Sequence, residues 1–313
     1  MPEIQRSPTP FYLPWAGMPR IEVKARDIVL TDRRHLLKLR RYLREKQGSI
    51  SSPVKKLWKE QAGVVTVSET RKALEIGTVT VEWAETWERQ LRDFVRDSMD
   101  PAWVKSIAES GDDVALNVNR LQKKQFDFDT TMSSVKGWVD NRGGSLIVDL
   151  TASQMGSVHA LLQDQIALGV TSPQLLAARI RPIVGLTVGE TNAVLKTMTA
   201  MTEEGLSPTV ITNQVEKYAK ILHKNRAMRI ARTELSNGYN FGHLDSVRQA
   251  ALEGWLPGIP EKDWIAGGQD PCEECLENEA AGYIDLNAAF PSGVQAPTTH
   301  PNDQCSLGSR IRR

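Results

Sequence analysis

The segment Asp270–Cys305, DPCEECLENEAAGYIDLNAAFPSGVQAPTTHPNDQC, contains every cysteine of the 313-residue chain. Cys272 and Cys275 form a Cys-x2-Cys pair, and after a gap of 24 residues His300 and Cys305 follow in a His-x4-Cys pair. This spacing is typical of a structural zinc site, in which two tight turns supply thiolates and an imidazole to one tetrahedron. Small modules with little apolar core usually need a metal or disulfides. The segment therefore predicts a compact module held by zinc at Cys272, Cys275, His300 and Cys305.

Other interpretations of the cysteines stay open. Asp303 can take the place of one ligand, since carboxylates also bind zinc. The Cys-x2-Cys pair can be redox active, although no βαβ pattern surrounds it, and the thiols can pack without any metal. A catalytic zinc would keep one position open for water, and Glu273, Glu274 and Glu277 are near in sequence, but nothing marks one of them as a base. We therefore expect a protein that is not an enzyme.

Composition describes a soluble globular protein, with 40% apolar residues, 25% charged residues and a net charge of +1. The whole chain has no field that would commit it to nucleic acid, so any electrostatic argument must be local. No apolar run approaches the length of a membrane span, and the first ten residues do not resemble a secretory signal. Three cysteines do not make a disulfide framework. We expect synthesis in a reducing cytoplasm and no membrane partner.

Residues 1–32 contain five prolines interleaved with Phe11, Tyr12, Leu13 and Trp15. Proline restricts φ and removes a hydrogen-bond donor, so the stretch favours extended conformations over helix. It is either a disordered tail or an extended arm whose aromatic side chains dock on a partner or on the protein itself.

Residues 33–46, RRHLLKLRRYLREK, have seven Lys or Arg and one Glu, with leucines at near-helical spacing. This pattern predicts a basic amphipathic helix whose partner is nucleic acid or an acidic face of an assembly; a solvated helix with buried leucines is the alternative. Its candidate binding residues are Arg33, Arg34, Lys38, Arg40, Arg41 and Arg44.

Helical patterns dominate the middle of the chain. Trp83, Trp87, Leu91 and Phe94 form one apolar stripe, which is typical of a core-facing helix, and a further helix is expected after Pro101. The sequence Asn-Arg-Gly-Gly at 141–144 indicates a break and a subdomain boundary.

Helix start and stop signals are frequent after this point. Ser172-Pro173 and Ser207-Pro208 are start signals, and Thr187 with Glu190 has the form of a capping box. Glycines at 169, 205 and 254 are stop signals. Together they predict helices over 152–168, 172–181, 188–204 and 208–252, followed by short strand-like pieces.

The expected fold is mainly α, with a small α+β C-terminal module and an extended N-terminal arm. Its expected divisions are an arm and basic helix, an N-terminal helical region, a helical domain, and a turn-rich Cys/His module: 1–50, 51–142, 143–253 and 254–313.

The stretch Arg226–Glu234, RAMRIARTE, followed by Asn237 and Gly238, resembles the RA-x-x-IARTE signature of the phage Mu F-like minor head proteins, or phage head morphogenesis family. Further pieces follow in the family's order and extend the resemblance over residues 125–307: Gly185-Leu186-Thr187, Lys262-Asp263-Trp264, Asp270, Cys272-x2-Cys275, Gly282 and His300-Pro301-Asn302. The chain departs from the family at its last motif, where HPNDQC stands in place of HPNCRC. This departure weakens the transfer of a metal site.

The resemblance implies that residues 143–253 form a helical domain of Mu F-like type in a minor capsid protein of a tailed phage. Such a protein is expected in the virion, in the head interior or at the portal, with portal and capsid proteins as partners. It would contact packaged double-stranded DNA and act in head assembly and genome delivery. A DNA-binding module with structural zinc is the alternative, and a zinc-dependent hydrolase or nuclease is a third hypothesis.

The motif helix itself has several interpretations. Its candidate residues are Arg226, Arg229, Arg232, Thr233 and Glu234. In the structural interpretation Ile230 and Ala231 enter the core, while Arg229, Arg232 and Glu234 form ion pairs that hold the helix against the Cys/His module. An active site on Arg232 and Glu234, or contact of this helix with DNA or the portal, are the alternatives.

Overall fold

The computed structural model describes residues 26–268 and 270–313 and is predominantly helical. The helices are α1 (Arg33–Val64), α2 (Val67–Ile76), α3 (Val81–Phe94), α4 (Asp100–Gln122), α5 (Ser133–Ala167), α6 (Pro173–Ile180), α7 (Val188–Glu203), α8 (Pro208–Leu252) and α9 (Glu273–Ala280). A π-helical turn, η1 (Val95–Met99), joins α3 to α4, and a 3-10 turn, η2 (Arg181–Ile183), follows α6. The strands are β1 (Ile28–Thr31), β2 (Ile259–Ile265), β3 (Ile284–Asp285) and β4 (Ser306–Arg312). The expected fold class, mainly α with a small α+β C-terminal module, is confirmed.

The four strands form one antiparallel sheet in the order β1-β4-β2-β3. Strand β1 pairs with β4, with Ile28 opposite Ile311, so a strand from the start of the described chain completes the C-terminal module. Part of the expected N-terminal arm is therefore a strand of the sheet. The arm's aromatic residues Phe11, Tyr12 and Trp15 lie outside the described residues.

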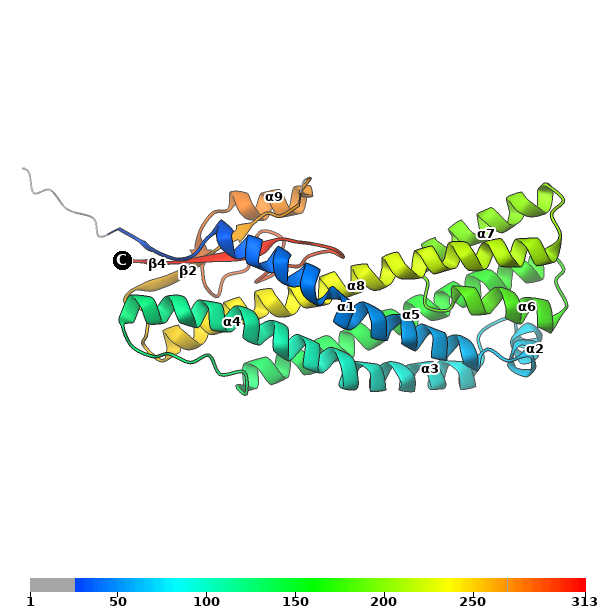
Figure 1. Cartoon of the computed structure of the whole chain (residues 1–313), viewed down its shortest axis with the longest axis horizontal. Coiled ribbons are helices and arrows are strands. Elements are labelled where there is room, and N and C mark those ends of the chain that lie inside the picture. The colour runs from blue at the N-terminus through cyan, green and yellow to red at the C-terminus, as the bar shows by residue number, and fades with distance from the viewer. Residues whose placement is uncertain (1–25, 269) are drawn as a thin grey trace, which may run out of the picture.

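The molecule is elongated, with the sheet at one end and α6 and α7 at the other (Figure 1). Helices α5 and α8 run along most of its length and contribute to two apolar cores. One core lies among α1, α4, α8 and the sheet; the other lies among α2, α3, α6 and α7. Trp83 and Trp87 are buried in the second core, and Leu91 and Phe94 in the first, so the predicted aromatic stripe faces the interior as expected. In the part of the chain that the structure describes, no helix has both the length and the apolar character to cross a membrane.

The helix boundaries follow the sequence signals closely after residue 168. Thr187 and Glu190 form the predicted capping box, with each side chain accepting a hydrogen bond from the other residue's backbone N–H. Ser172 caps α6 through the N–H of Leu175. Ser207 occupies the N-cap position of α8, but its hydroxyl makes no capping bond, so this part of the prediction is wrong.

The break expected at residues 141–144 is absent, because α5 continues through it from Ser133 to Ala167. Gly143 faces the core, where a Cβ atom would lie 3.1 Å from Val95 and 3.8 Å from Trp103. The glycine allows α5 to approach η1 and α4 closely, and it does not form a turn. The helix predicted to begin at 152 begins at Ser133, and the boundary placed between 142 and 143 falls inside it. The boundary placed between 50 and 51 likewise falls inside α1.

The helix expected after Pro101 continues directly from α3 through η1. Proline lacks the N–H that an α-helix needs at this position, and a π turn is a common way to accommodate an interruption of the hydrogen-bond pattern. Here the N–H of Asp100 donates to the carbonyl of Val95, five residues earlier. Helix α3, which contains Trp83 and Trp87, therefore continues through η1 into α4 as one long helical segment.

The C-terminal module has a larger apolar core than its turn-rich sequence indicates. Trp264, Phe290, Leu307 and Ile311 are fully buried, and the sheet packs against α1 and α8. The expectation that the module has little apolar core treated residues 254–313 as a free-standing unit, whereas their apolar side chains share one core with the helices. A metal is consequently not the sole element that holds this segment.

Candidate metal centre

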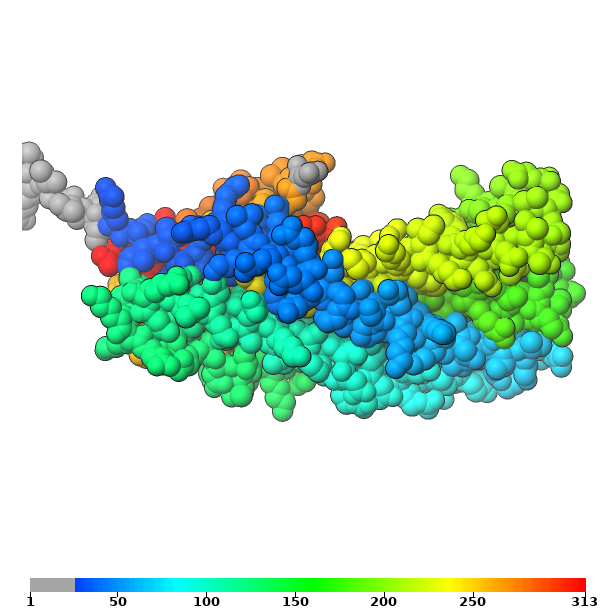
Figure 2. Space-filling view, viewed as in Figure 1, coloured from blue at the N-terminus to red at the C-terminus, as the bar shows by residue number. Residues whose placement is uncertain are grey.

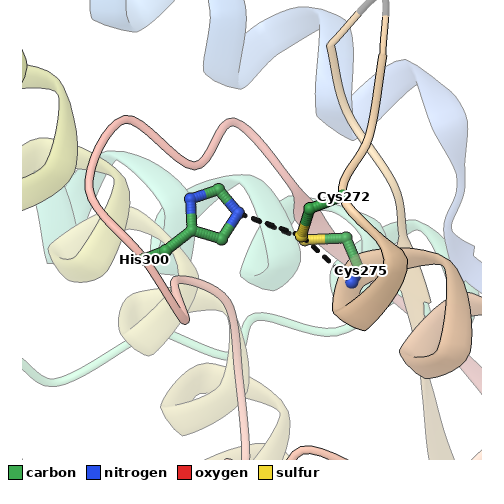
Figure 3. Close-up of side chains that lie close together, drawn as sticks. All are labelled: Cys272, Cys275 and His300. Atoms are coloured by element: carbon green, nitrogen blue, oxygen red, sulfur yellow. Dashed lines mark hydrogen bonds between the residues drawn. The ribbon is translucent and has the colours of Figure 1, made fainter.

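The three cysteines and His300 come together at the surface of the C-terminal module. Cys272 is the N-cap of α9, and its sulfur accepts a hydrogen bond from the N–H of Cys275 at 3.4 Å. His300 lies on the loop that leads to β4, and its ring points toward the cysteine pair (Figure 3). Its Nε2 atom is 3.3 Å from the sulfur of Cys272 and 3.7 Å from that of Cys275. Cys305 directly precedes β4 and is buried.

These side chains form two overlapping groups of ligand atoms. Cys272, Cys275 and His300 make one group, and Cys275, Asp303 and Cys305 make the other, with the ligand atoms of each group within 4.8 Å of one another. In a tetrahedral zinc site with Zn–S near 2.3 Å and Zn–N near 2.0 Å, ligand atoms are separated by about 3.5 to 3.8 Å. The distances from His300 to the two sulfurs match this separation. Three of the four predicted ligands, Cys272, Cys275 and His300, therefore form one group, while Cys305 belongs to the second group and is linked to the first through Cys275.

Asp303 organises the loop that presents His300. It is buried, and its Oδ1 accepts the N–H of Cys305 at 2.7 Å while its Oδ2 accepts the N–H of Thr299 at 3.1 Å. Both carboxylate oxygens thus have backbone partners. The geometry gives Asp303 a positioning role for Cys305, while its distance also places it in the second ligand group.

The surroundings of the cysteines favour different protonation states. Burial raises the pKa of Cys305 to about 12 and, with the nearby Asp303 charge, also raises the pKa of Cys275. At Cys272, burial alone would raise the pKa, but hydrogen bonds from the Cys275 N–H and from His300 outweigh it and lower the pKa. Two of the three thiols are therefore protonated at neutral pH, and a bound cation would have to displace these protons.

The loop that carries His300 is attached to α8 through polar contacts. The N–H of Asn302 donates to Thr233 Oγ1 at 2.8 Å, and Thr298 donates to Asn237 Oδ1. Deeper in the module, Asn240 donates to the carbonyl of Cys305 at 3.0 Å. The motif helix and the Cys/His module therefore form one contiguous unit.

The charged residues of the motif helix mostly contact the helical body. Glu234 is buried and pairs with Arg142 of α5, and it also accepts a hydrogen bond from Trp103 at 3.2 Å. Arg229 pairs with Glu190 at 2.9 Å. The prediction that ion pairs of these residues hold α8 against the module is wrong: Arg229 and Glu234 pair with the helical body, and Arg232 forms no ion pair among the described residues. Arg232 does reach the module through a hydrogen bond to Asn302 at 3.5 Å.

Arg226 and the two apolar motif residues complete this arrangement. Arg226 is buried and donates to the carbonyl of Gly185 at 2.7 Å and to Ser153 at 3.1 Å. Burial lowers its pKa to about 10. Ala231 is fully buried, as expected, and Ile230 is half-buried against the same core.

Most of the candidate basic residues in the first turns of α1 have an acidic side chain close by. Arg33 pairs with Glu279, Arg34 with Asp32, and Lys38 with Asp113. Arg41 lies 4.0 Å from Glu45 on the same helix. Arg40 is half-buried and Arg44 is exposed. The electrostatic support for DNA binding by these residues is consequently weaker than their sequence indicates.

Sequence reasoning missed a chain of buried polar groups that lies between the helices and the sheet. It runs from Asp113 through His35 and His243 to Ser309 and Thr31. His35 and His243 are separated by 208 positions, so no local spacing could reveal the pair. The signal that the sequence does offer is a histidine among the apolar residues of each helix, His35 in α1 and His243 in α8.

Comparison of the chain with protein-family models, with curated proteins and with solved structures finds no match.

Proposed function

We propose that the protein is a minor capsid protein of a tailed phage that binds at the portal or the capsid interior and acts in head assembly and genome delivery. The single observation that supports this proposal is the contact pattern of the residues that carry the resemblance. Arg226 binds the Gly185 turn, Arg229 binds Glu190 at the start of α7, and Thr233 binds the His300 loop. Stretches that are distant in sequence thus join around one helix, as expected if they are the signature of one fold.

The proposed role is assembly and not catalysis. The polar residues of the motif helix are used in structural contacts, with Glu234 bonded to both Arg142 and Trp103. Contact with packaged DNA is the less supported part of the proposal, because most of the basic side chains near the start of α1 already have acidic partners.

Deleting residues 1–25 tests attachment to the portal. We expect full-length protein to co-purify with co-expressed portal protein or procapsids, and the deletion variant to lose this association while keeping its melting temperature. The deletion stops at residue 25 because Ile28–Thr31 is a strand of the sheet, whose loss would disturb the fold itself.

Two outcomes are informative in different ways. If full-length protein binds neither the portal nor procapsids, the proposed function is wrong. If the deletion variant binds as well as full-length protein, attachment lies in the folded body and the docking role of the arm is wrong.

We further propose that Cys272, Cys275, His300 and Cys305 hold a structural zinc ion, which would crosslink the start of α9 to the loop before β4. We expect the purified protein to contain about one zinc per chain. Cys275→Ser should abolish zinc binding because Cys275 belongs to both ligand groups. Asp303→Asn should retain zinc if Asp303 positions the loop and is not a ligand.

Chelation should then act locally. Because Trp264 and Phe290 are buried in the core that the module shares with α1 and α8, we expect faster hydrogen exchange in residues 272–280 and 298–305 and little change elsewhere. Metal-free protein with the same exchange pattern as the zinc-loaded protein would contradict a structural role.

A further inference from the structure

A cleft lies between the C-terminal part of α1 and the N-terminal part of α8. In Figure 2 the surfaces of these two helices meet near the middle of the molecule and separate toward the end that contains α6 and α7. The volume of the cleft is about 580 Å³, and η2 closes one side of it. On the α1 side its wall consists of Lys55, Trp58, Lys59 and Ala62. These positions have the spacing i, i+3, i+4 and i+7, so they form a single stripe two turns long, about 10 Å along the helix axis.

The α8 side of the cleft has the same spacing. Glu216, Ala219, Lys220 and His223 follow one another at i, i+3, i+4 and i+7. The side chain of His223 donates from Nε2 to the carbonyl of Val184 at 2.9 Å, and burial lowers its pKa, so this residue is a neutral part of the floor. The cleft is therefore a groove between two stripes of helical side chains, one on α1 and one on α8.

The floor of the groove is apolar and contains small residues. Trp58 is 4% exposed, and its ring lies between the backbone of Gly185 and the guanidinium of Arg226, which is 5.6 Å from the ring centroid. A stacking ligand therefore has no free face of Trp58 to use. Ala62 is partly exposed and Ala219 is buried beneath the groove, and these short side chains leave room for another backbone to approach, which favours a helix as the occupant.

The rim of the groove is basic and its charges are free. Lys55, Lys59, Lys220 and Arg181 surround it, and among residues 26–268 and 270–313 none of them has an acidic partner within ion-pair distance. Arg181 donates to the carbonyl of Val65, and Glu216 is the single acidic side chain in the lining. This contrasts with the start of α1, where most cations are paired.

We propose that this groove docks an acidic amphipathic helix of a partner protein. Its apolar face would cover the partly exposed Ala62 and Pro182, above the buried Trp58 and Ala219, and its carboxylates would meet the lysines on both rims. This is the helix-in-groove mode of recognition. The proposal does not depend on the capsid function, since it rests on the shape and charge of the groove. Two turns of a helix match the length of the two stripes.

A peptide-binding measurement tests the proposal with the full-length protein. The probe is a fluorescein-labelled 15-residue peptide of glutamate and leucine, with leucines at i, i+3, i+4 and i+7, and fluorescence polarisation is the readout. We expect saturable binding that is at least tenfold weaker for Lys59→Glu and for Lys220→Glu, which lie on opposite walls. Lys59→Arg should bind as the unmodified protein does.

Lys56→Glu is the matched control, because Lys56 is on the same helix but pairs with Glu60 at 3.7 Å and does not line the groove. We expect its affinity to stay within twofold, and all variants to melt as the unmodified protein does. The proposal is overturned by the absence of binding at 100 µM peptide, by equal binding of a lysine-leucine peptide, or by equal weakening in Lys56→Glu. Displacement of the peptide by ATP at equal concentration would also overturn it, because the occupant would then be a small phosphate anion.

Discussion

Replacing Gly242 with alanine is expected to destabilise the protein by roughly 3 kcal/mol, because the new methyl group would overlap the backbone of α4. A Cβ atom at this position would lie 2.7 Å from the Cα of Ile107 and 2.8 Å from its carbonyl carbon. Both atoms belong to a helix backbone, so neither can move aside as the end of a flexible side chain can. The two helices would have to separate along their whole contact.

The neighbouring contacts show how much that separation would disturb. Ser106 of α4 donates to the carbonyl of Leu235 at 2.7 Å, and Ser246 of α8 donates to the carbonyl of Gly111 at 2.9 Å. A Cβ at Gly238 would lie 3.1 Å from Ser106. Small residues on both helices thus permit the close crossing and the hydrogen bonds that accompany it.

Gly144→Ala is the matched control for this prediction. Gly144 is in the helix α5, is exposed, and has nothing within 4 Å of the position of a Cβ. Alanine there should stabilise the protein by about 0.5–1 kcal/mol, because glycine has the larger conformational entropy to lose in a helix. Urea unfolding of both variants measures the difference. An equal effect of the two substitutions would show that the α4–α8 approach is not as close as described.

Glycines also show which features of the fold the sequence can and cannot predict. Several signals that act within a few residues are confirmed: the capping box at Thr187 and Glu190 begins α7, and the helix stops at Gly205 and Gly254 are glycines with φ of +75°. The cap predicted at Ser207 is an exception. A glycine in the middle of a chain has two opposite meanings, a turn or a close approach of another helix. At 143 the choice depends on Val95 and Trp103, which no local pattern identifies.

Non-local pairing explains the other differences. The cysteine cluster could be predicted because ligand types and spacing are themselves local evidence of a metal site. The acidic partners of the basic helix could not be predicted, because Glu279 and Asp113 are distant from α1 in sequence and contact it only in the folded protein. The pairing of β1 with β4, with Ile28 opposite Ile311, is hidden for the same reason.

Acidification is expected to destabilise the protein steeply between about pH 6.5 and pH 5, through the buried histidines His35 and His243. Their rings bond directly, with His243 Nδ1 3.0 Å from His35 Nε2. Burial lowers the pKa of both, and for His243 the proximity of His35 lowers it further. The unfolded chain therefore binds protons that the folded protein excludes.

The hydrogen-bond chain explains why the folded protein accepts few protons. His35 donates from Nδ1 to Asp113 at 3.3 Å, which leaves its Nε2 as an acceptor for the N–H of His243. His243 Nε2 in turn accepts from the hydroxyl of Ser309, at 3.1 Å, or from that of Thr31. Every group is satisfied when both rings are neutral. A further proton on Nε2 of His35 would place two N–H donors against each other and one positive charge in a buried site.

The sign of the pH dependence follows from these lowered pKa values. Above pH 6.5 both states hold neutral histidines and the stability is complete; below it, each histidine that stays neutral only in the folded state costs up to about 1.4 kcal/mol per pH unit. Protonation of Asp113 affects the stability of the protein only at lower pH. Burial alone would raise its pKa, but hydrogen bonds from His35 and Lys38 bring the pKa to about 2.

His243→Gln separates this chain from other titrating groups. We expect the variant to be less stable at pH 7.5, by about 2 kcal/mol for its lost buried hydrogen bonds, yet to lose less stability than the unmodified protein between pH 7 and pH 5. His159→Gln is the control, because His159 is exposed and should leave the slope unchanged. Urea unfolding at three pH values measures the slopes. Parallel slopes for His243→Gln and the unmodified protein would show that the acid sensitivity arises elsewhere, with His223 as the next buried candidate.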